Sequence, residues 1–201
     1  ASANGAKDGG KESDKKKDGL KASVKDGAKN VDPSQPVTVK TTGKLKSVTM
    51  TNELGVEVKE KLSKDAKTWS TAEDLGYNHT YSIVASDVDG NKKKLSFSTP
   101  QAAGVAEVSL SPIPDSEVGV GQVIGVNFGV PITDRKAAEK TITVTTNPEV
   151  KGAFYWVNNQ EVRWRPKEYW EPGTKVEVKV DQYGKDLGGG IYGGENAKTN
   201  F

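Results

Sequence analysis

Short runs of alternating apolar and polar residues recur along this chain, and turn-forming residues separate them. Between residues 31 and 100 the runs are PVTVK, LKSVTM, VEVKEKL, TYSIVAS and KKLSFS. A second set occupies residues 106–180 and comprises AEVSLS, GQVIGVNFGV, KTITVTT, AFYWV, EVRWR and KVEVKV. Strands this short, with a turn about every 8–12 residues, are typical of antiparallel β-sandwiches. We therefore predict an all-β protein with a single helical turn, at residues 134–139 (DRKAAE).

Changes in composition divide the 201 residues into segments. Residues 1–30 are rich in Lys, Gly, Ser, Ala and Asp, and their only larger apolar side chains are Leu20 and Val24. Such a segment buries too little apolar surface to offset its ordering entropy, so we predict a flexible linker. Residues 31–100 then form a first β domain, residues 101–106 (QAAGVA) form a joint, and residues 107–201 form a second β domain.

An internal repeat supports two domains of the same kind. Each copy places a tryptophan before a corner and a period-two strand after it: Trp69, Leu75, Tyr77, His79, Tyr81 and Ile83 match Trp164, Trp170, Pro172, Thr174, Val176 and Val178. In the first copy, the spacing from Leu75 to Tyr81 resembles the tyrosine corner of immunoglobulin-like sandwiches. We therefore predict two tandem immunoglobulin-like antiparallel β-sandwiches. The second copy is nine residues longer between its tryptophan and its closing phenylalanine, and residues 181–196, with six glycines, hold the excess.

The charge balance and the residue types that are missing exclude several functions. The 29 basic and 27 acidic residues give a net charge of +2, which argues against a nucleic-acid partner. The sequence contains no cysteine, so thiol catalysis, disulfides and Cys-based metal sites are excluded. No apolar run approaches the ~18 residues that a membrane-spanning helix needs.

Three patterns resemble chemical sites, but none keeps its required context. Residues 87–91 (DVDGN) have the glycine of a calcium loop too early and Ser98 where the closing glutamate belongs, so we predict a hairpin turn. Residues 188–193 (GGGIYG) satisfy G-x-G-x-x-G, but no helix-forming sequence follows them. His79, the only histidine, has no nucleophile motif beside it and is predicted to be a polar corner residue. We therefore predict no catalytic residue, no metal and no cofactor.

Residues 154–174 (FYWVNNQEVRWRPKEYWEPGT) hold six of the fourteen aromatic residues. A two-residue turn at Asn158 and Asn159 predicts a β-hairpin in which Trp156 faces Glu161 and Phe154 faces Arg163. Alternation then places Tyr155, Val157, Val162 and Trp164 in the core and leaves a second face made by Phe154, Trp156, Arg163 and Arg165.

A face of aromatic and arginine side chains favours a protein interface or a sugar-stacking site. The alternative is that Trp156 packs beneath the glycine-rich segment or another strand. A register error of one residue would exchange the two faces.

The run WVNNQEVRWRPKEYWEPGTKVEVKVDQYGKDLGGGIYGGEN (residues 156–196) resembles the second immunoglobulin-like domain of actinobacterial L,D-transpeptidases. Those enzymes cross-link peptidoglycan stems between two meso-diaminopimelate residues. The family arrangement is a lipid or helical membrane anchor, a linker, one or two such domains and a catalytic domain. The resemblance covers residues 31–201 and is looser in the first domain.

The family's nucleophile is a cysteine in a Ser-His-Gly-Cys motif, which this chain lacks, so no catalytic residue can be transferred. The resemblance implies a non-catalytic spacer whose partner is the transpeptidase domain of the same protein, beginning close to Phe201. It also implies an extracytoplasmic location, tethered to the outer face of the cytoplasmic membrane, without membrane contact by the folded domains. We expect the glycine-rich segment, with Tyr183 and Tyr192, and the final strand to dock on that transpeptidase domain.

Two other functions remain open from the sequence. One is a module that binds peptidoglycan or another partner through Phe154, Trp156, Arg163 and Arg165. The other is a free-standing pair of adhesin-type domains, which the abrupt end of the last strand at Phe201 disfavours.

Overall fold

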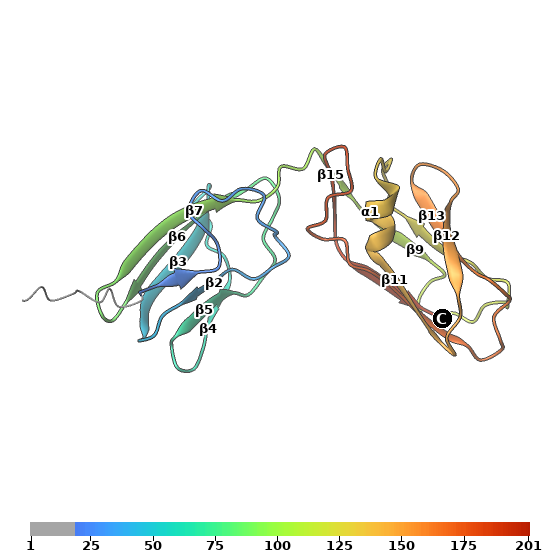
Figure 1. Ribbon diagram of the computed structural model, residues 1–201, viewed down its shortest axis with the longest axis horizontal. Coiled ribbons are helices and arrows are strands. Elements are labelled where there is room, and N and C mark those ends of the chain that lie inside the picture. The colour runs from blue at the N-terminus through green and yellow to red at the C-terminus, as the bar shows by residue number, and fades with distance from the viewer. Residues whose placement is uncertain (1–18) are drawn as a thin grey trace, which may run out of the picture.

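The computed structural model describes residues 19–201, and these residues are almost entirely β (Figure 1). The part of the predicted linker in residues 1–18 lies outside the described residues. Two separate hydrophobic cores, built from buried residues between 20 and 97 and between 106 and 187, divide the described chain. We call the two halves sandwich A (residues 19–98) and sandwich B (residues 104–201); they lie end to end.

Sandwich A consists of two antiparallel sheets. The first has the strand order β1-β2-β5-β4 and contains β1 (Lys21–Ala22), β2 (Thr38–Lys40), β5 (Thr68–Thr71) and β4 (Glu60–Leu62). The second has the order β3-β6-β7 and contains β3 (Leu45–Asn52), β6 (Thr80–Asp87) and β7 (Lys92–Ser98). Burial alternates along β6, as its period-two sequence predicts for a strand with one face on the core.

Sandwich B repeats this plan. Its four-stranded sheet has the order β9-β10-β13-β12 and contains β9 (Ser109–Ser111), β10 (Ile124–Asn127), β13 (Glu161–Pro166) and β12 (Gly152–Trp156). Its three-stranded sheet contains β11 (Ile142–Asn147), β14 (Lys175–Val180) and β16 (Ala197–Asn200), in that order. The predicted helical turn is α1 (Arg135–Lys140), whose N-terminus is capped by the Asp134 side chain. A parallel pair, β8 (Gly104–Ala106) and β15 (Ile191–Gly193), is additional.

Numbered within its own sandwich, each seven-strand set has the orders 1-2-5-4 and 3-6-7. These are the ABED and CFG sheets of a constant-type immunoglobulin domain. The prediction of two tandem immunoglobulin-like sandwiches is therefore confirmed. The additional strand β15 lies in the glycine-rich segment where the sequence predicted the extra residues.

The internal repeat corresponds to equivalent core positions. Trp69 on β5 and Trp164 on β13 are both buried, on the same strand of the two topologies. In sandwich A the Tyr81 hydroxyl accepts a hydrogen bond of 3.0 Å from the Gly76 amide, which is the predicted tyrosine corner. Sandwich B has Val176 in place of that tyrosine, and there the Trp170 indole donates to the Gln122 carbonyl instead.

Two predicted boundaries differ from the structure. Residues 19–30 were assigned to the linker, but Leu20 is buried in core A and β1 pairs with β2. The amides of Gly27 and Val31 also donate to carbonyls of β7, so this segment covers the edge of that strand. Residues 101–106 were assigned to the joint, but β8 belongs to sandwich B, where Ala106 is fully buried.

Residues 87–91 form the predicted turn between β6 and β7. The buried Asp87 carboxylate accepts hydrogen bonds from the Asn91 side chain and from the amides of Asn91 and Asp89. These hydrogen bonds lower the pKa of Asp87, and the bond from the Asn91 side chain has the largest effect. The Asp87 carboxylate therefore accepts the hydrogen bonds that the backbone and side-chain donors of this turn offer.

Candidate interaction surfaces

The β12–β13 hairpin has a different register from the predicted one. Phe154 pairs with Trp164, Tyr155 with Arg163, and Trp156 with Val162, so three residues, 158–160, form the loop. The Asn158 side chain accepts hydrogen bonds from the backbone amides of residues 160 and 161. The carbonyls of residues 159 and 160 accept hydrogen bonds from the amides of residues 132 and 128, respectively. The hydrogen bonds from residues 128 and 132 come from a distant segment, which explains why the two-residue turn predicted from local sequence is wrong.

The shift exchanges the faces of β12. Phe154 and Trp156 point inward and pack against core B. The Trp156 ring stacks on Phe128 at a centroid separation of 6.1 Å and an interplanar angle of 17°. The Arg135 guanidinium from α1 lies 5.1 Å from the centre of the same ring. Trp156 therefore contacts both a core aromatic and a cation. Its packing against core B agrees with the alternative that the sequence left open, but neither of these two partners was predicted.

The solvent-facing side of the hairpin carries Tyr155, Arg163 and Arg165, which we call the outer hairpin face. Tyr155 is 39% exposed and lies directly across from Arg163. A Glu161 carboxylate oxygen lies 3.2 Å from the Arg163 guanidinium. The predicted placement of both arginines on the surface is correct, but their aromatic neighbour is Tyr155 rather than Phe154 or Trp156.

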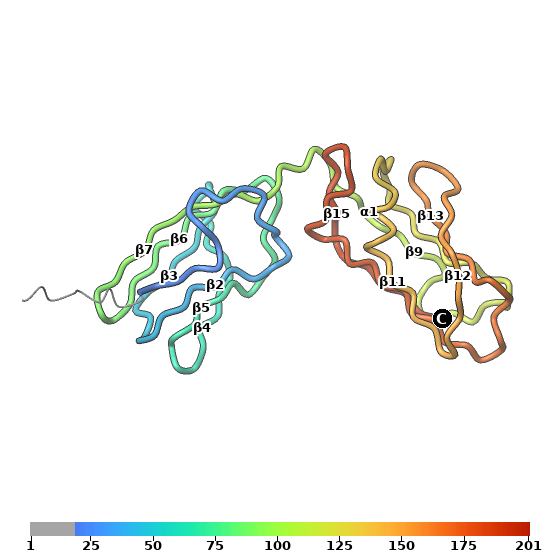
Figure 2. The backbone as a smooth tube through the Cα atoms, in the orientation of Figure 1, coloured from blue at the N-terminus to red at the C-terminus, as the bar shows by residue number. Residues whose placement is uncertain are grey.

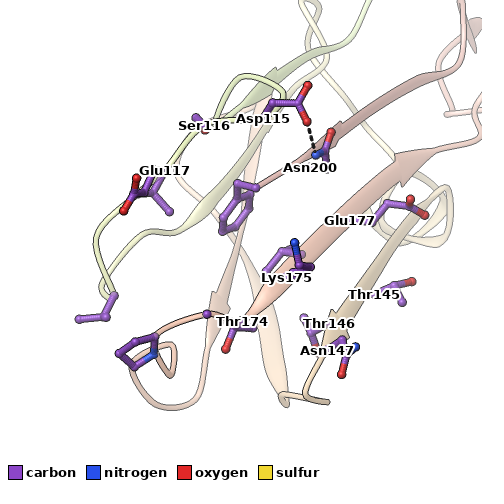
Figure 3. Close-up of a pocket in the computed structure, with 16 residues that line it drawn as sticks. Asp115, Ser116, Glu117, Thr145, Thr146, Asn147, Thr174, Lys175, Glu177 and Asn200 are labelled. Carbon is purple, nitrogen blue, oxygen red and sulfur yellow. Dashed lines mark hydrogen bonds between the residues drawn. The ribbon is translucent and has the colours of Figure 1, made fainter.

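An open groove of ≈ 920 Å³ lies at the end of sandwich B that carries residue 201 (Figure 3). Residues 115–118, the end of β11, the turn before β14 and residues 200–201 line it. Asp115, Glu117 and Glu177 contribute carboxylates, and Lys175 contributes an amine. The Asn200 side chain donates to Asp115 at 2.8 Å, which ties the loop to β16. The groove is thus polar and predominantly acidic, with Phe201 among its apolar lining.

Tyr183 and Tyr192 lie at the opposite end of sandwich B, beside sandwich A. Their ring centres are 5.2 and 5.3 Å from that of Tyr77. Burial raises the pKa of Tyr77 and raises the pKa of Tyr183 to about 12. The structure therefore separates the six predicted site residues into three places: the core side of β12, the outer hairpin face and the junction between sandwiches.

Two of the sequence patterns that resembled chemical sites lie in a strand corner and in a loop. His79 lies at the predicted corner, where its Nδ1 is 2.7 Å from the Glu53 carboxylate. Residues 188–190 belong to the loop that leads into β15 and do not begin a helix. Between residues 19 and 201 no group of three or more His, Asp or Glu side chains is arranged to hold a metal ion. No helix in that range is long and apolar enough to cross a membrane.

Two constant-type sandwiches joined end to end define a tandem immunoglobulin-like protein. Its sequence matches the profile of the bacterial Ig domain family over residues 28–186, and the chain belongs to that family. A chain in the crystal structure of Dpr2 Ig1-Ig2 in complex with DIP-Theta Ig1-Ig3 aligns with 90% of this chain and 96% of its own, at a TM-score of 0.53. Their identity is 10%, so this likeness concerns the fold alone.

The sequence relatives are mycobacterial L,D-transpeptidases, as the resemblance implied. The chain is 46% identical to L,D-transpeptidase 2 of Mycobacterium tuberculosis, over 90% of this chain and 46% of that protein. It is 31% identical to L,D-transpeptidase 5 of the same species, over 88% of this chain and 41% of that protein. The chain therefore spans less than half the length of these relatives.

Proposed function

We propose that this chain is the non-catalytic spacer of a cell-wall L,D-transpeptidase, located outside the cytoplasmic membrane and tethered to it. The observation that carries this proposal is the 46% identity to L,D-transpeptidase 2 across nine tenths of the chain. The two sandwiches would hold the transpeptidase domain of the same protein at a set distance from its anchor. Acyl transfer through a thioester needs a thiol, and the chain has none, so the chemistry would reside in that domain.

A direct assay tests whether cross-linking activity requires the transpeptidase domain. The purified chain, incubated with muropeptides that contain meso-diaminopimelate, should form no cross-linked product. The parent protein, which adds the transpeptidase domain, should form it. Cross-linking by the chain alone would overturn the proposal.

The groove at the end of sandwich B is the proposed docking surface for the transpeptidase domain. Phe201 is among its lining residues, and the C-terminal end of the chain, marked in Figure 1, lies away from sandwich A. The glycine-rich segment, which the sequence analysis expected to dock on the transpeptidase domain, contacts sandwich A through Gly184 and Gly193. The acidic lining of the groove favours a basic patch on the transpeptidase domain.

Charge reversal in the parent enzyme tests this docking. Glu117→Lys should lower both the thermal stability of the transpeptidase domain and the cross-linking rate, because it places a cation in the acidic groove. Glu57→Lys, an exposed site in sandwich A, is the matched control and should change neither. Equal behaviour of the two variants would exclude the groove as the docking surface.

A second candidate is peptidoglycan binding by the outer hairpin face. The exposed Tyr155 opposite Arg163 favours it, since an aromatic ring can stack on a sugar while arginine pairs with a stem-peptide carboxylate. The chain should then sediment with insoluble peptidoglycan at low salt, and Tyr155→Ala or Arg163→Ala should reduce the bound fraction. Tyr169→Ala, at a side chain that is 79% exposed, is the control. No co-sedimentation of the wild-type chain would reject this function.

A further inference from the structure

We propose that the glycine-rich loop of sandwich B, residues 183–194, is the docking surface for sandwich A, so that both sandwiches move as one rigid body. Figure 2 shows this loop, in red and including β15, facing the blue and green loops at the end of sandwich A. This proposal stands independently of the spacer function, because it depends only on contacts within the chain.

The Tyr77 hydroxyl connects the two sandwiches. It accepts a hydrogen bond of 2.6 Å from the Gly184 amide and donates one of 2.6 Å to the Gly193 carbonyl. A further hydrogen bond joins the sandwiches, because the Tyr183 hydroxyl of sandwich B donates to the Leu75 carbonyl of sandwich A. With the rings of Tyr183 and Tyr192 against that of Tyr77, one tyrosine of sandwich A is held by both ends of the loop.

Gly184 explains why this part of the loop is glycine. Its φ of +84° is disfavoured for other residues, and a Cβ there would lie 2.2 Å from Oδ1 of Asp32 in sandwich A. That oxygen cannot withdraw freely, because it accepts hydrogen bonds from the Ser34 amide and hydroxyl at 2.9 and 2.7 Å. Close approach of the two sandwiches therefore requires the absence of a side chain at position 184.

The connecting segment is fixed from both sides. On the side of sandwich A, the Asn78 side chain accepts from the Ala102 amide at 2.8 Å and donates to the Ala102 carbonyl at 3.3 Å. On the side of sandwich B, the Ala103 amide donates to the Gly190 carbonyl at 2.9 Å. Ala102 and Ala103, consecutive residues of the connecting segment, are thus bonded to different sandwiches, which leaves no free hinge between the sandwiches.

Backbone ¹⁵N relaxation of the chain measures whether the sandwiches tumble together. Wild-type protein should give one rotational correlation time for both sandwiches. Gly184→Ala should give two shorter and unequal times, because the added methyl group meets Asp32. Tyr77→Phe, which removes only the bridging hydroxyl, should move the times in the same direction.

Matched variants separate loss of docking from local strain. Gly173 has a φ of +86° and open space around it, so Gly173→Ala imposes similar backbone strain away from the junction and should leave a common correlation time. Asp32→Ala removes the atom that the new methyl group meets and should partly restore common tumbling when combined with Gly184→Ala. Independent tumbling of the wild-type sandwiches, or a common time in Gly184→Ala, would overturn the proposal.

Discussion

The Tyr81 side chain joins a buried ring to a backbone hydrogen bond at the start of β6. Its ring centre lies 5.6 Å from that of Phe97 in core A, and its hydroxyl accepts a hydrogen bond from the Gly76 amide. The corner between β5 and β6 is thereby anchored to the core. The Thr99 hydroxyl donates to the Gly76 carbonyl at 2.7 Å, so the other polar group of the same glycine is also satisfied. This residue-level arrangement sets the position of Tyr77, four residues before Tyr81.

Tyr81→Phe tests the corner alone. The variant keeps the ring but leaves the Gly76 amide without its acceptor, which should cost about 1–2 kcal/mol in the free energy of unfolding of sandwich A. Denaturant unfolding, followed at Trp69 or by NMR, measures the loss. Tyr155→Phe on the exposed outer hairpin face is the control and should be neutral within about 0.5 kcal/mol. An unchanged stability in Tyr81→Phe would mean that water replaces the hydroxyl at no cost.

At the scale of elements, the sequence predicted strands well where alternation was regular and partners were local. KVEVKV became β14 with alternating burial, and the helical turn predicted at residues 134–139 became α1 (Arg135–Lys140), with Asp134 as its N-cap. Short β1 was missed because Leu20 has few apolar neighbours in the sequence, whereas in the structure it is part of core A and the next two residues pair with β2. The hairpin register was missed because carbonyls of the loop bond to residues 128 and 132, a contact that local turn rules do not contain.

The candidate site residues were likewise predicted correctly where the pattern was local and missed where the partner is distant in the chain. Sequence placed Arg163 and Arg165 on the surface, because β13 alternates regularly against a buried Val162 and Trp164. It did not predict that Tyr183 contacts sandwich A, since the partner carbonyl of Leu75 is 108 residues away in the chain. Glycine content did mark the right segment, but only the contact between Gly184 and Asp32 explains why glycine is required there.

Helix α1 and the β12–β13 hairpin are coupled through Arg135. Its guanidinium lies over Trp156 and also donates to the Asn159 side chain at 3.4 Å. Arg135→Ala should destabilise sandwich B by about 0.5–1 kcal/mol, the range of a partly exposed cation–π contact. It should also make Trp156 more accessible to acrylamide quenching. The neighbouring Lys136→Ala, at a side chain that is 89% exposed, is the matched control. Equal effects of the two variants would show that Arg135 contributes only its helix propensity.

At the scale of the whole molecule, the junction makes two topologically identical sandwiches unequal. Sandwich A contributes a tyrosine corner and Tyr77, whereas sandwich B contributes the inserted loop with β15. The ends of sandwich B therefore have different partners: the loop end meets sandwich A, and the groove end is open to solvent. A fixed junction would transmit the orientation of sandwich A to whatever sandwich B carries, as a spacer of defined length requires.

Alkaline pH should release this junction. The pKa of Tyr183 rises from 10.0 to about 12 because its neutral hydroxyl is partly buried, and the pKa of Tyr77 is raised for the same reason. A raised pKa in the docked state favours the protonated form, so the stabilisation is complete below pH 10 and is lost as the pH rises through about 12. Small-angle scattering should therefore show the two sandwiches losing their fixed arrangement between these values.

Tyr183→Phe identifies the group responsible for the alkaline change. The variant cannot ionise at this position, so the part of the alkaline change due to Tyr183 should disappear, while docking at neutral pH weakens through loss of the bond to the Leu75 carbonyl. The Tyr169→Phe control removes an exposed phenol of sandwich B and should leave the scattering titration unchanged. A Tyr183→Phe titration that coincides with the wild-type curve would show that ionisation elsewhere, rather than at the junction, separates the sandwiches.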